Sequence, residues 1–313
     1  MADRAGGQRL DVTARIFLFL LLVACQLSLS GGSPRPSHLN FIPSATRVAL
    51  LDLGTSETAR KVGVLLEHAL KSDSSISLVD RELAMAAARG VGYGGSLNMS
   101  VDEARNLGTA IGCDFFIVGD AQTIRRSASD RPVYFETYSS LFLVSTRDGH
   151  LMQWFRPRSE RLSHEASEES LLSELEVQAP SYISEIKQAA ASLQAVKLKA
   201  QTEGAVLFEP APDDEKTATE KGIRLPQPYR RIRPDYPRSA AEADAEGTVD
   251  VLVDIDASGE VAAVDVVRWA GFGLDEAAVQ TIRRLHFRPA TIKNSPTSIR
   301  IMLRYNFRRP VNK

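Results

Sequence analysis

Residues Gly247–Ile255, with the sequence GTVDVLVDI, alternate between apolar and polar side chains. Four apolar residues fall on one face of an extended chain and three polar ones on the other: Val249, Val251, Val253 and Ile255 against Thr248, Asp250 and Asp254. A period of two is typical of a strand with one buried face. This stretch therefore predicts a strand with a core on one side and solvent on the other.

The residues that follow predict a hairpin and a helix lying across it. Asp256–Gly259 has the composition of a turn, and Val261–Trp269 returns as the partner strand. Apolar residues then recur at helical spacing until Phe287–Ala290 stops the helix: Leu274, Ala278, Ile282 and Leu285. Together these segments form half of a small α+β domain.

A last alternating stretch, Ile299–Arg308, completes the domain as a three-stranded antiparallel sheet packed on one helix. Its apolar side chains are expected to pack under the helix, and its arginines to face solvent. An edge strand leaves backbone donors and acceptors unpaired. Arg300, Arg304 and Arg308 either blunt this edge against association, or the edge accepts an extended peptide as a further strand.

Six segments, in order and at their observed spacing, resemble the TonB C-terminal domain over about residues 225–313: Pro234–Pro237, Ala240-Ala241, Glu246–Val249, Val253–Gly259, Leu274–Ala278 and Phe287–Ala290. Members of that family grip an extended segment of an outer-membrane receptor by strand addition near the last strand. The resemblance implies a turn that helps to hold the partner and a strand that pairs with it: Tyr236 and Pro237, then Ser298, Ile299, Arg300, Ile301, Met302, Leu303, Arg304 and Tyr305.

The N-terminal residues predict export to the cell envelope. Residues 1–30 combine three arginines with a short apolar run, which suits a secretory leader or membrane anchor better than a full spanning helix. Leu22–Cys25 resembles a bacterial lipobox, which would make Cys25 a lipidation site. A plain cleaved leader and a short uncleaved anchor stay open. Each version places the following domains in the periplasm.

Residues 31–45 are rich in Gly, Ser and Pro and are expected to be a tether. Residues 46–200 alternate apolar strands with helices and end in a hairpin around Asp148-Gly149, which predicts an α/β domain with a mixed sheet. Pro180 is expected to break its last helix. A solvated linker is expected over 201–224. Arg47–Leu53 and Leu107–Asp120 weakly resemble the N-terminal module of TolB-type and curli-secretion-type periplasmic lipoproteins over about 46–121.

Composition and motifs favour a binding protein over an enzyme. The 313 residues carry a net charge of −1, 43% hydrophobic residues and two cysteines, which gives no indication of nucleic-acid binding or a zinc site. Gly90, Gly92 and Gly95 match a dinucleotide motif but follow a helix. The acidic spacing from Asp254 to Asp265 matches a calcium loop, but it reads better as a turn with a solvated face. We therefore expect no cofactor, no metal and no catalytic residue.

Two functions stay open at this point. The first is a membrane-tethered TonB-family protein that binds an outer-membrane receptor or other envelope protein by strand addition. In this function, motor subunits of the inner membrane are further partners for energy transduction. The leader has no histidine, and a folded domain replaces most of the long spacer of a typical transducer. The alternative is a structural or assembly lipoprotein whose C-terminal domain only docks it.

Overall fold

The computed structural model describes residues 45–128, 131–200, 208–212 and 215–310. The predicted leader, most of the tether and Cys25 lie outside these residues. All the described residues belong to one compact structural unit, Ser44–Lys313. Among them, no helix combines the length and the hydrophobicity that crossing a membrane requires.

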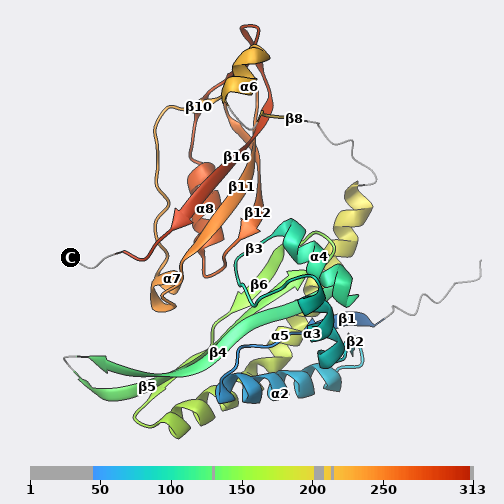
Figure 1. Ribbon diagram of the computed structural model, residues 1–313, viewed down its shortest axis with the longest axis vertical. Coiled ribbons are helices and arrows are strands. Elements are labelled where there is room, and N and C mark those ends of the chain that lie inside the picture. The colour runs from blue at the N-terminus through green and yellow to red at the C-terminus, as the bar shows by residue number, and fades with distance from the viewer. Residues whose placement is uncertain (1–44, 129–130, 201–207, 213–214, 311–313) are drawn as a thin grey trace, which may run out of the picture. The chain divides into compact units, whose positions relative to one another are not determined.

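The α/β domain is built on a mixed sheet with the strand order β2-β1-β4-β5-β6, and β7 also pairs with β5 (Figure 1). Its strands are β1 (Thr46–Leu50), β2 (Ile76–Leu78), β4 (Phe115–Ala128), β5 (Arg131–Ser145), β6 (Leu151–Phe155) and β7 (Arg158–Arg161). β1 runs parallel to β2 and β4, while the β4–β5, β5–β6 and β5–β7 pairs are antiparallel. The predicted mixed sheet is confirmed.

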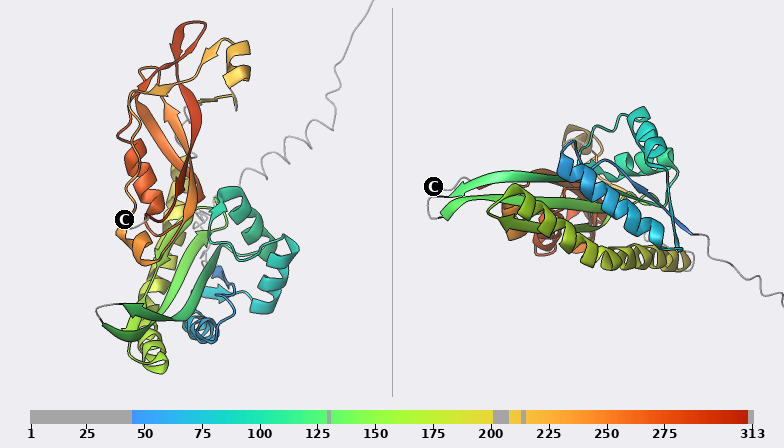
Figure 2. Two further views of the ribbon diagram at one scale, coloured as in Figure 1. Left: turned by 60° about the vertical axis from the view of Figure 1, so that its left-hand side comes forward. Right: turned by 90° about the horizontal axis from the view of Figure 1, so that it is seen from below.

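Alternating side chains divide the core of this domain between the two faces of the sheet. Val48 and Leu50 pack with α2 (Glu57–Ser72) and α5 (His164–Ala200), which lie side by side on one face (Figure 2). Ala49 and Leu51 belong to the cluster on the other face, with α3 (Arg81–Gly90) and α4 (Val101–Ile111). The near-continuous apolar run of β1 follows from burial on both faces.

The predicted break at Pro180 is wrong, because α5 continues through it. A proline removes one backbone donor and crowds the preceding turn, at a cost of about 3 kcal/mol in a helix interior. Here the buried residues Leu171 and Leu175 before it, and Tyr182 and Ile186 after it, all pack in the same core. Tertiary packing on both sides therefore offsets the local cost.

The C-terminal sheet has the order β3-β12-β11-β16-β8. Its centre is the predicted three-stranded antiparallel sheet, formed by β11 (Gly247–Ile255), β12 (Val261–Trp269) and β16 (Ile299–Phe307). The helix α8 (Leu274–Ile282) packs on it, as expected from its buried residues Leu274, Ala278 and Ile282. The α+β fold class is confirmed, and two short strands extend the sheet at its edges: β3 (Met99–Ser100) and β8 (Glu209–Pro210).

Part of the segment expected to be a solvated linker is instead structured. β8 pairs in parallel with the start of β16, the helix α6 (Glu215–Glu220) follows, and β9 (Ile223–Arg224) pairs with β14 (Ala290–Ile292). Residues 201–207 of that segment lie outside the described residues. The remaining short elements are β10 (Gln227–Pro228), α7 (Arg238–Glu242), β13 (Phe287–Arg288) and β15 (Ser295–Thr297).

The acidic turn between β11 and β12 is held by its own hydrogen bonds. One carboxylate oxygen of Asp256 accepts hydrogen bonds from the backbone amides of Ser258 and Glu260, at 2.8 and 3.0 Å, and from the Ser258 hydroxyl. Gly259 supplies the positive φ of 89° that the turn requires. These hydrogen bonds give the aspartate a local structural role.

Candidate partner-binding surface

The strand β16 is the centre of the predicted partner site, and its side chains divide as the alternation predicts. It pairs with β11 without interruption over nine residue pairs, from Gly247 opposite Phe307 to Ile255 opposite Ile299. Ile299 and Phe307 are buried in the core, and Ile301, Leu303 and Tyr305 are partly buried against it. Met302, Arg304 and Asn306 are exposed on the other face.

Two of the arginines predicted to face solvent have exposed side chains but also pair with buried aspartates. Arg300 donates through Nε and Nη2 to Asp254, at 2.6 and 2.8 Å, and Arg304 donates in the same way to Asp250, at 2.6 and 2.9 Å. The aspartates are only 6% and 5% exposed. These carboxylates raise the pKa of both guanidinium groups. The arginines therefore neutralise β11, which leaves less free charge at the edge than we expected.

The backbone of β16 points alternately toward β11 and toward the outer edge. Arg300 faces outward, because its carbonyl accepts a hydrogen bond of 2.7 Å from the amide of Ala211, just after β8. In an antiparallel strand the N–H and C=O of one residue point the same way, and the direction alternates along the chain. Met302, Arg304 and Asn306 therefore present their donors and acceptors outward, while Ile301 bonds with β11.

Among the described residues, the outer edge of β16 is paired only at its start. β8 lies against Ile299 and Arg300, which covers two of the residues predicted to bind the partner. Ser298, another predicted residue, lies between β15 and β16 and is half-buried. Beyond Arg300, no other strand of the described chain pairs with this edge. About five residues of strand edge thus remain open.

The predicted holding turn lies near the opposite end of β16. The hydroxyl of Tyr236 donates to the carbonyl of Ala245, at 2.6 Å, two residues before the start of β11. Burial raises the pKa of this hydroxyl. Pro237 is the N-cap residue of α7, with an extended backbone at φ −64° and ψ 150°. Tyr236 thus fixes the chain just before β11, whose first residue lies opposite the end of β16.

The opposite edge of the sheet, at β12, is joined to the α/β domain. β3 pairs with Arg268 and Trp269 at the end of β12. The side chain of Asn98 donates to the carbonyls of Thr248 and Trp269, at 2.8 and 2.6 Å, and accepts from the amide of Thr248, at 3.1 Å. One amide group therefore satisfies three backbone groups on two strands of the C-terminal sheet.

Trp269 is the largest side chain at this junction, and it is 1% exposed. Its indole N–H donates to the carbonyl of Gly149, at 3.0 Å, in the turn between β5 and β6. Its ring lies 6.1 Å from that of Phe142 in a stacked arrangement, and Phe142 meets Phe272 edge to face at 5.2 Å. A single hydrophobic cluster therefore runs from the α/β sheet into the core of the C-terminal domain.

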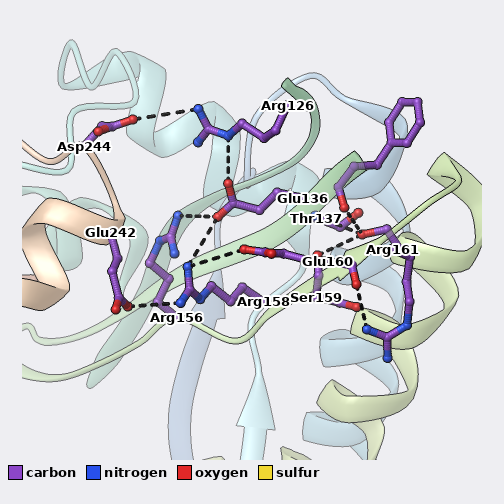
Figure 3. A network of polar contacts seen from close by, with 12 residues as sticks. Arg126, Glu136, Thr137, Arg156, Arg158, Ser159, Glu160, Arg161, Glu242 and Asp244 are labelled. Atoms are coloured by element: carbon purple, nitrogen blue, oxygen red, sulfur yellow. Dashed lines mark hydrogen bonds and ion pairs between the residues drawn. The ribbon is translucent and has the colours of Figure 1, made fainter. Parts of the chain in front are cut away.

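An ionic network ties the α7 segment to the β4–β5 hairpin (Figure 3). Glu136, only 4% exposed, accepts from Arg126 at 2.9 Å and from Arg156 at 3.4 Å. Arg126 lies 3.9 Å from Asp244. Arg158 likewise reaches Glu242 at 3.3 Å. The segment that follows the Tyr236-Pro237 turn is thus anchored to the first domain through charge pairs.

Sequence reasoning missed the residues of this junction. Glu136 sits in an alternating strand, where a carboxylate gives no sign of being buried. Asn98 lies in a Gly-rich and Ser-rich stretch that has the composition of a loop. Trp269, at the end of an alternating strand and before Gly271 and Gly273, was the one available signal, because a tryptophan buries a large apolar area and its N–H usually finds a partner when buried.

Residues 232–308 match the family model described as the Gram-negative bacterial TonB protein C-terminal. The resemblance stated from the motifs is thereby confirmed for this part of the chain. The match begins just before the Pro234–Pro237 motif and includes all of β11, α8 and β16. The C-terminal part of the protein is therefore similar to the TonB C-terminal domain over residues 232–308.

The chain is also similar to several solved structures. The C-terminal domain of TonB from Pseudomonas aeruginosa is 21% identical, with 32% of this chain and 94% of that chain covered and a TM-score of 0.25. The C-terminal domain of LpoB from Salmonella enterica is 16% identical over 45% and 94%, at a TM-score of 0.27. The lipoprotein GNA1162 from Neisseria meningitidis is 14% identical over 45% and 99%, at 0.30.

Scores this low identify neither a family nor a function. No curated protein matches the chain.

Proposed function

We propose that this protein is an envelope adaptor that binds an extended segment of a partner protein along the open outer edge of β16. The α/β domain holds the C-terminal domain from the other side. The partner is an outer-membrane receptor or another protein of the periplasm. No catalytic step, cofactor or metal forms part of the proposal.

The single observation that carries this proposal is the pairing of β8 with the start of β16. The chain's own segment at Glu209–Ala211 already adds to this edge, and the amide of Ala211 bonds with the carbonyl of Arg300. The same edge continues through Met302, Arg304 and Asn306, whose backbone groups point outward. A partner strand would continue the ladder there, with backbone hydrogen bonds supplying affinity and side-chain contacts supplying selectivity.

The regularity of β16 favours it over β12 as the site of addition. The β11–β16 register is continuous, whereas the β11–β12 register shifts between Asp250 and Val251 and again between Asp254 and Ile255. Bulges twist a strand and disrupt its ladder, so an irregular strand is a poorer template for a partner. β12 is also joined to β3 at its end.

Substitution of Met302 tests the proposal directly. Proline at this position removes an outward-facing donor from an edge strand, where proline is tolerated, and alanine removes the same side chain but keeps the donor. Full-length chains carrying Met302→Pro or Met302→Ala would be used to capture partners from solubilised envelopes, and the affinity of the captured partner would then be measured by titration calorimetry. We expect Met302→Pro to weaken binding about tenfold or more and Met302→Ala to weaken it by less than about threefold.

Equal binding by the proline and alanine variants would rule out strand addition at β16. The proline variant must keep the thermal unfolding midpoint of the wild type within a few degrees for the comparison to count. Ile301→Pro is unsuitable for this purpose, because the N–H of Ile301 points to β11 and its loss damages the domain itself.

A second candidate function rests on the contacts at the other edge of the sheet. Asn98, Trp269 and the Glu136 network all join the C-terminal domain to the α/β domain of the same chain. In this candidate the protein is a structural or assembly lipoprotein, and the C-terminal domain serves to dock the α/β domain. It predicts a lipidated Cys25 in the mature protein and no binding defect in Met302→Pro.

Transduction of energy from the proton gradient is an additional role within the first candidate function, the envelope adaptor. It requires an N-terminus that stays in the inner membrane and contacts motor subunits. The mass of the N-terminal peptide from purified envelopes distinguishes the cases: an intact Met1 supports transduction, and an acylated Cys25 contradicts it. Partner binding that does not respond to collapse of the proton gradient would leave adaptor binding as the whole function.

A further inference from the structure

The arginines of the C-terminal domain form two sets that differ in their partners. Six lie within 4 Å of a carboxylate: Arg238, Arg268, Arg300, Arg304, Arg308 and Arg309. The other six are exposed and make no ion pair with a described residue: Arg230, Arg231, Arg233, Arg283, Arg284 and Arg288. The unpaired set falls in two short segments of the chain, 230–233 and 283–288.

These two segments lie side by side. β10 pairs with β13, and the amide of Tyr229 donates to the carbonyl of His286 at 2.9 Å. The guanidinium of Arg288 lies 5.9 Å from the centre of the Tyr229 ring, and that ring is 65% exposed. The unpaired arginines are therefore concentrated on one face of the domain, which we call the basic face.

A groove of about 1040 Å³ opens beside the basic face, which contributes Arg288 to its lining. Arg224 from β9, Arg288 from β13 and Lys293 from the β14–β15 turn line it, and none of its lining residues within the described part of the chain carries a carboxylate. All three cations are exposed and make no ion pair with another residue that the structure describes. The amide of Lys293 donates to the carbonyl of Gly222 at 3.0 Å, which brings the turn to the β9 side of the groove.

The backbone conformation of the turn at Lys293 is an independent observation on the same segment. Lys293 and Asn294 both have positive φ, at 49° and 67°. A two-residue hairpin turn of this kind favours Asn and Gly at both positions, and a lysine in it is strained. A residue kept in an unfavourable conformation is commonly one that serves a function.

We propose that this groove binds a phosphate-bearing ligand, either the phosphorylated headgroup of a lipid or a soluble phosphate ester. Guanidinium groups present forked donors that match phosphate oxygens, and Lys293 adds a point charge at the groove. The volume exceeds what one carboxylate side chain fills and is large enough for a phosphorylated headgroup. The site lies on β9, β13 and the β14–β15 turn, so it is independent of strand addition at β16.

The test compares two triple variants of the full-length chain in neutral detergent. The groove variant is Arg224→Gln, Arg288→Gln and Lys293→Gln. The control variant is Arg238→Gln, Arg308→Gln and Arg309→Gln, which removes the same charge from paired arginines of the same domain. Calorimetry with inositol hexakisphosphate measures the soluble arm. Flotation with phosphatidylcholine vesicles, with or without phosphatidylglycerol, measures the lipid arm.

We expect the groove variant to lose about 100-fold in affinity for inositol hexakisphosphate or for the phosphatidylglycerol vesicles, and the control variant less than about threefold. The arm that shows the loss identifies the source of the phosphate. Equal losses in both variants would overturn the proposal, because the binding would then reflect net charge alone. The proposal would also be overturned if polyglutamate of equal charge bound as tightly as the phosphate ligand and lost its affinity in the groove variant. The groove would then be a site for an acidic peptide.

Thermal unfolding midpoints check that the variants are folded. The single substitution Lys293→Glu tests the same groove with only one change. It is expected to weaken the same arm by at least tenfold, because it places a carboxylate among the phosphate oxygens. An unchanged affinity in Lys293→Glu, with the midpoint preserved, would also contradict the site.

Discussion

The two edges of the C-terminal sheet are used differently. At β12, backbone pairing with β3, a buried tryptophan and the side chain of Asn98 attach the edge to the α/β domain. At β16, the short strand β8 pairs with Ile299 and Arg300, and the described chain leaves the rest open. Since a sheet with two open edges invites association, one edge is closed within the chain and the other stays available.

This difference shows how a small binding domain can be held without losing its site. The contacts at β12 involve large buried groups, whereas those at β16 are backbone groups of exposed residues. Loss of a contact at β12 should therefore reduce the stability of the folded protein, and loss of a donor at β16 should reduce partner binding with little change in stability. The substitutions below test this division, from the largest expected effect to the smallest.

Trp269→Ala should have the largest effect on stability. The substitution empties a buried site between the Phe142 ring and the Gly149 carbonyl, and we expect a loss of about 4 kcal/mol in the free energy of unfolding. Trp269→Phe keeps a ring but removes the indole donor, and should cost about 1–2 kcal/mol. Urea unfolding of both variants measures the difference. A loss below about 1 kcal/mol in Trp269→Ala would show that the β12 edge is not held by this contact.

Ile301→Pro and Met302→Pro should separate the two sides of β16. The N–H of Ile301 faces β11, so its proline variant loses a ladder hydrogen bond inside the sheet and should cost about 3 kcal/mol or more. The N–H of Met302 faces the outer edge, so its proline variant should cost less than about 1 kcal/mol. Urea midpoints of the two variants decide this. The reverse order would mean that the outward face of the strand has been assigned to the wrong residues.

Asn98→Ala should cost about 2 kcal/mol, because the amide and carbonyl of Thr248 and the carbonyl of Trp269 lose their partner. Asn106 is a matched control on the exposed side of α4, and Asn106→Ala should change the free energy of unfolding by no more than about 0.5 kcal/mol. Hydrogen exchange at Thr248 should also accelerate in Asn98→Ala alone. Similar exchange in both variants would remove Asn98 from the junction.

The sequence could predict which face of a strand is buried but not which edge of it is free. Alternation in Gly247–Ile255 and Ile299–Phe307 reports side-chain direction, and the structure follows it. The direction of the N–H groups lies in the plane of the sheet and depends on the neighbouring strand, so the roles of Ile301 and Met302 could not be distinguished in advance. The expectation that Pro180 breaks its helix fails for a similar reason. Whether α5 continues through the proline depends on the packing of the residues before and after it, which the local sequence does not show.

The junction between the domains was also beyond prediction, because it is made by very short or isolated features. Met99 and Ser100 form a strand of two residues, which has no period to detect. At the other edge of the sheet, β8 at Glu209–Pro210 is equally short and contains a proline, so its composition indicates a linker. Tertiary contacts alone make these residues strands.

The smallest expected effect is on the pH dependence of folding stability. It tests whether contacts of the α/β domain hold the β12 edge. His150, in the turn after β5, lies between Asp148 at 3.6 Å and Asp265 of β12 at 3.0 Å. The carboxylates of Asp148 and Asp265 raise the pKa of His150 from 6.5 to about 9. Because the folded-state value is the higher one, the stabilisation is complete below pH 6.5 and is lost as the pH rises through about 9.

The side chain of His150 is 35% exposed, so solvent screening reduces the effect to about 1 kcal/mol. His150→Gln should flatten the decline of the urea midpoint between pH 6.5 and 9, and His68→Gln, at an exposed position of α2, should leave it unchanged. A decline that persists in His150→Gln would assign the titration to another group. A decline removed by His150→Gln and also by Asp265→Asn would place it across the β12 edge, where the α/β domain meets the sheet.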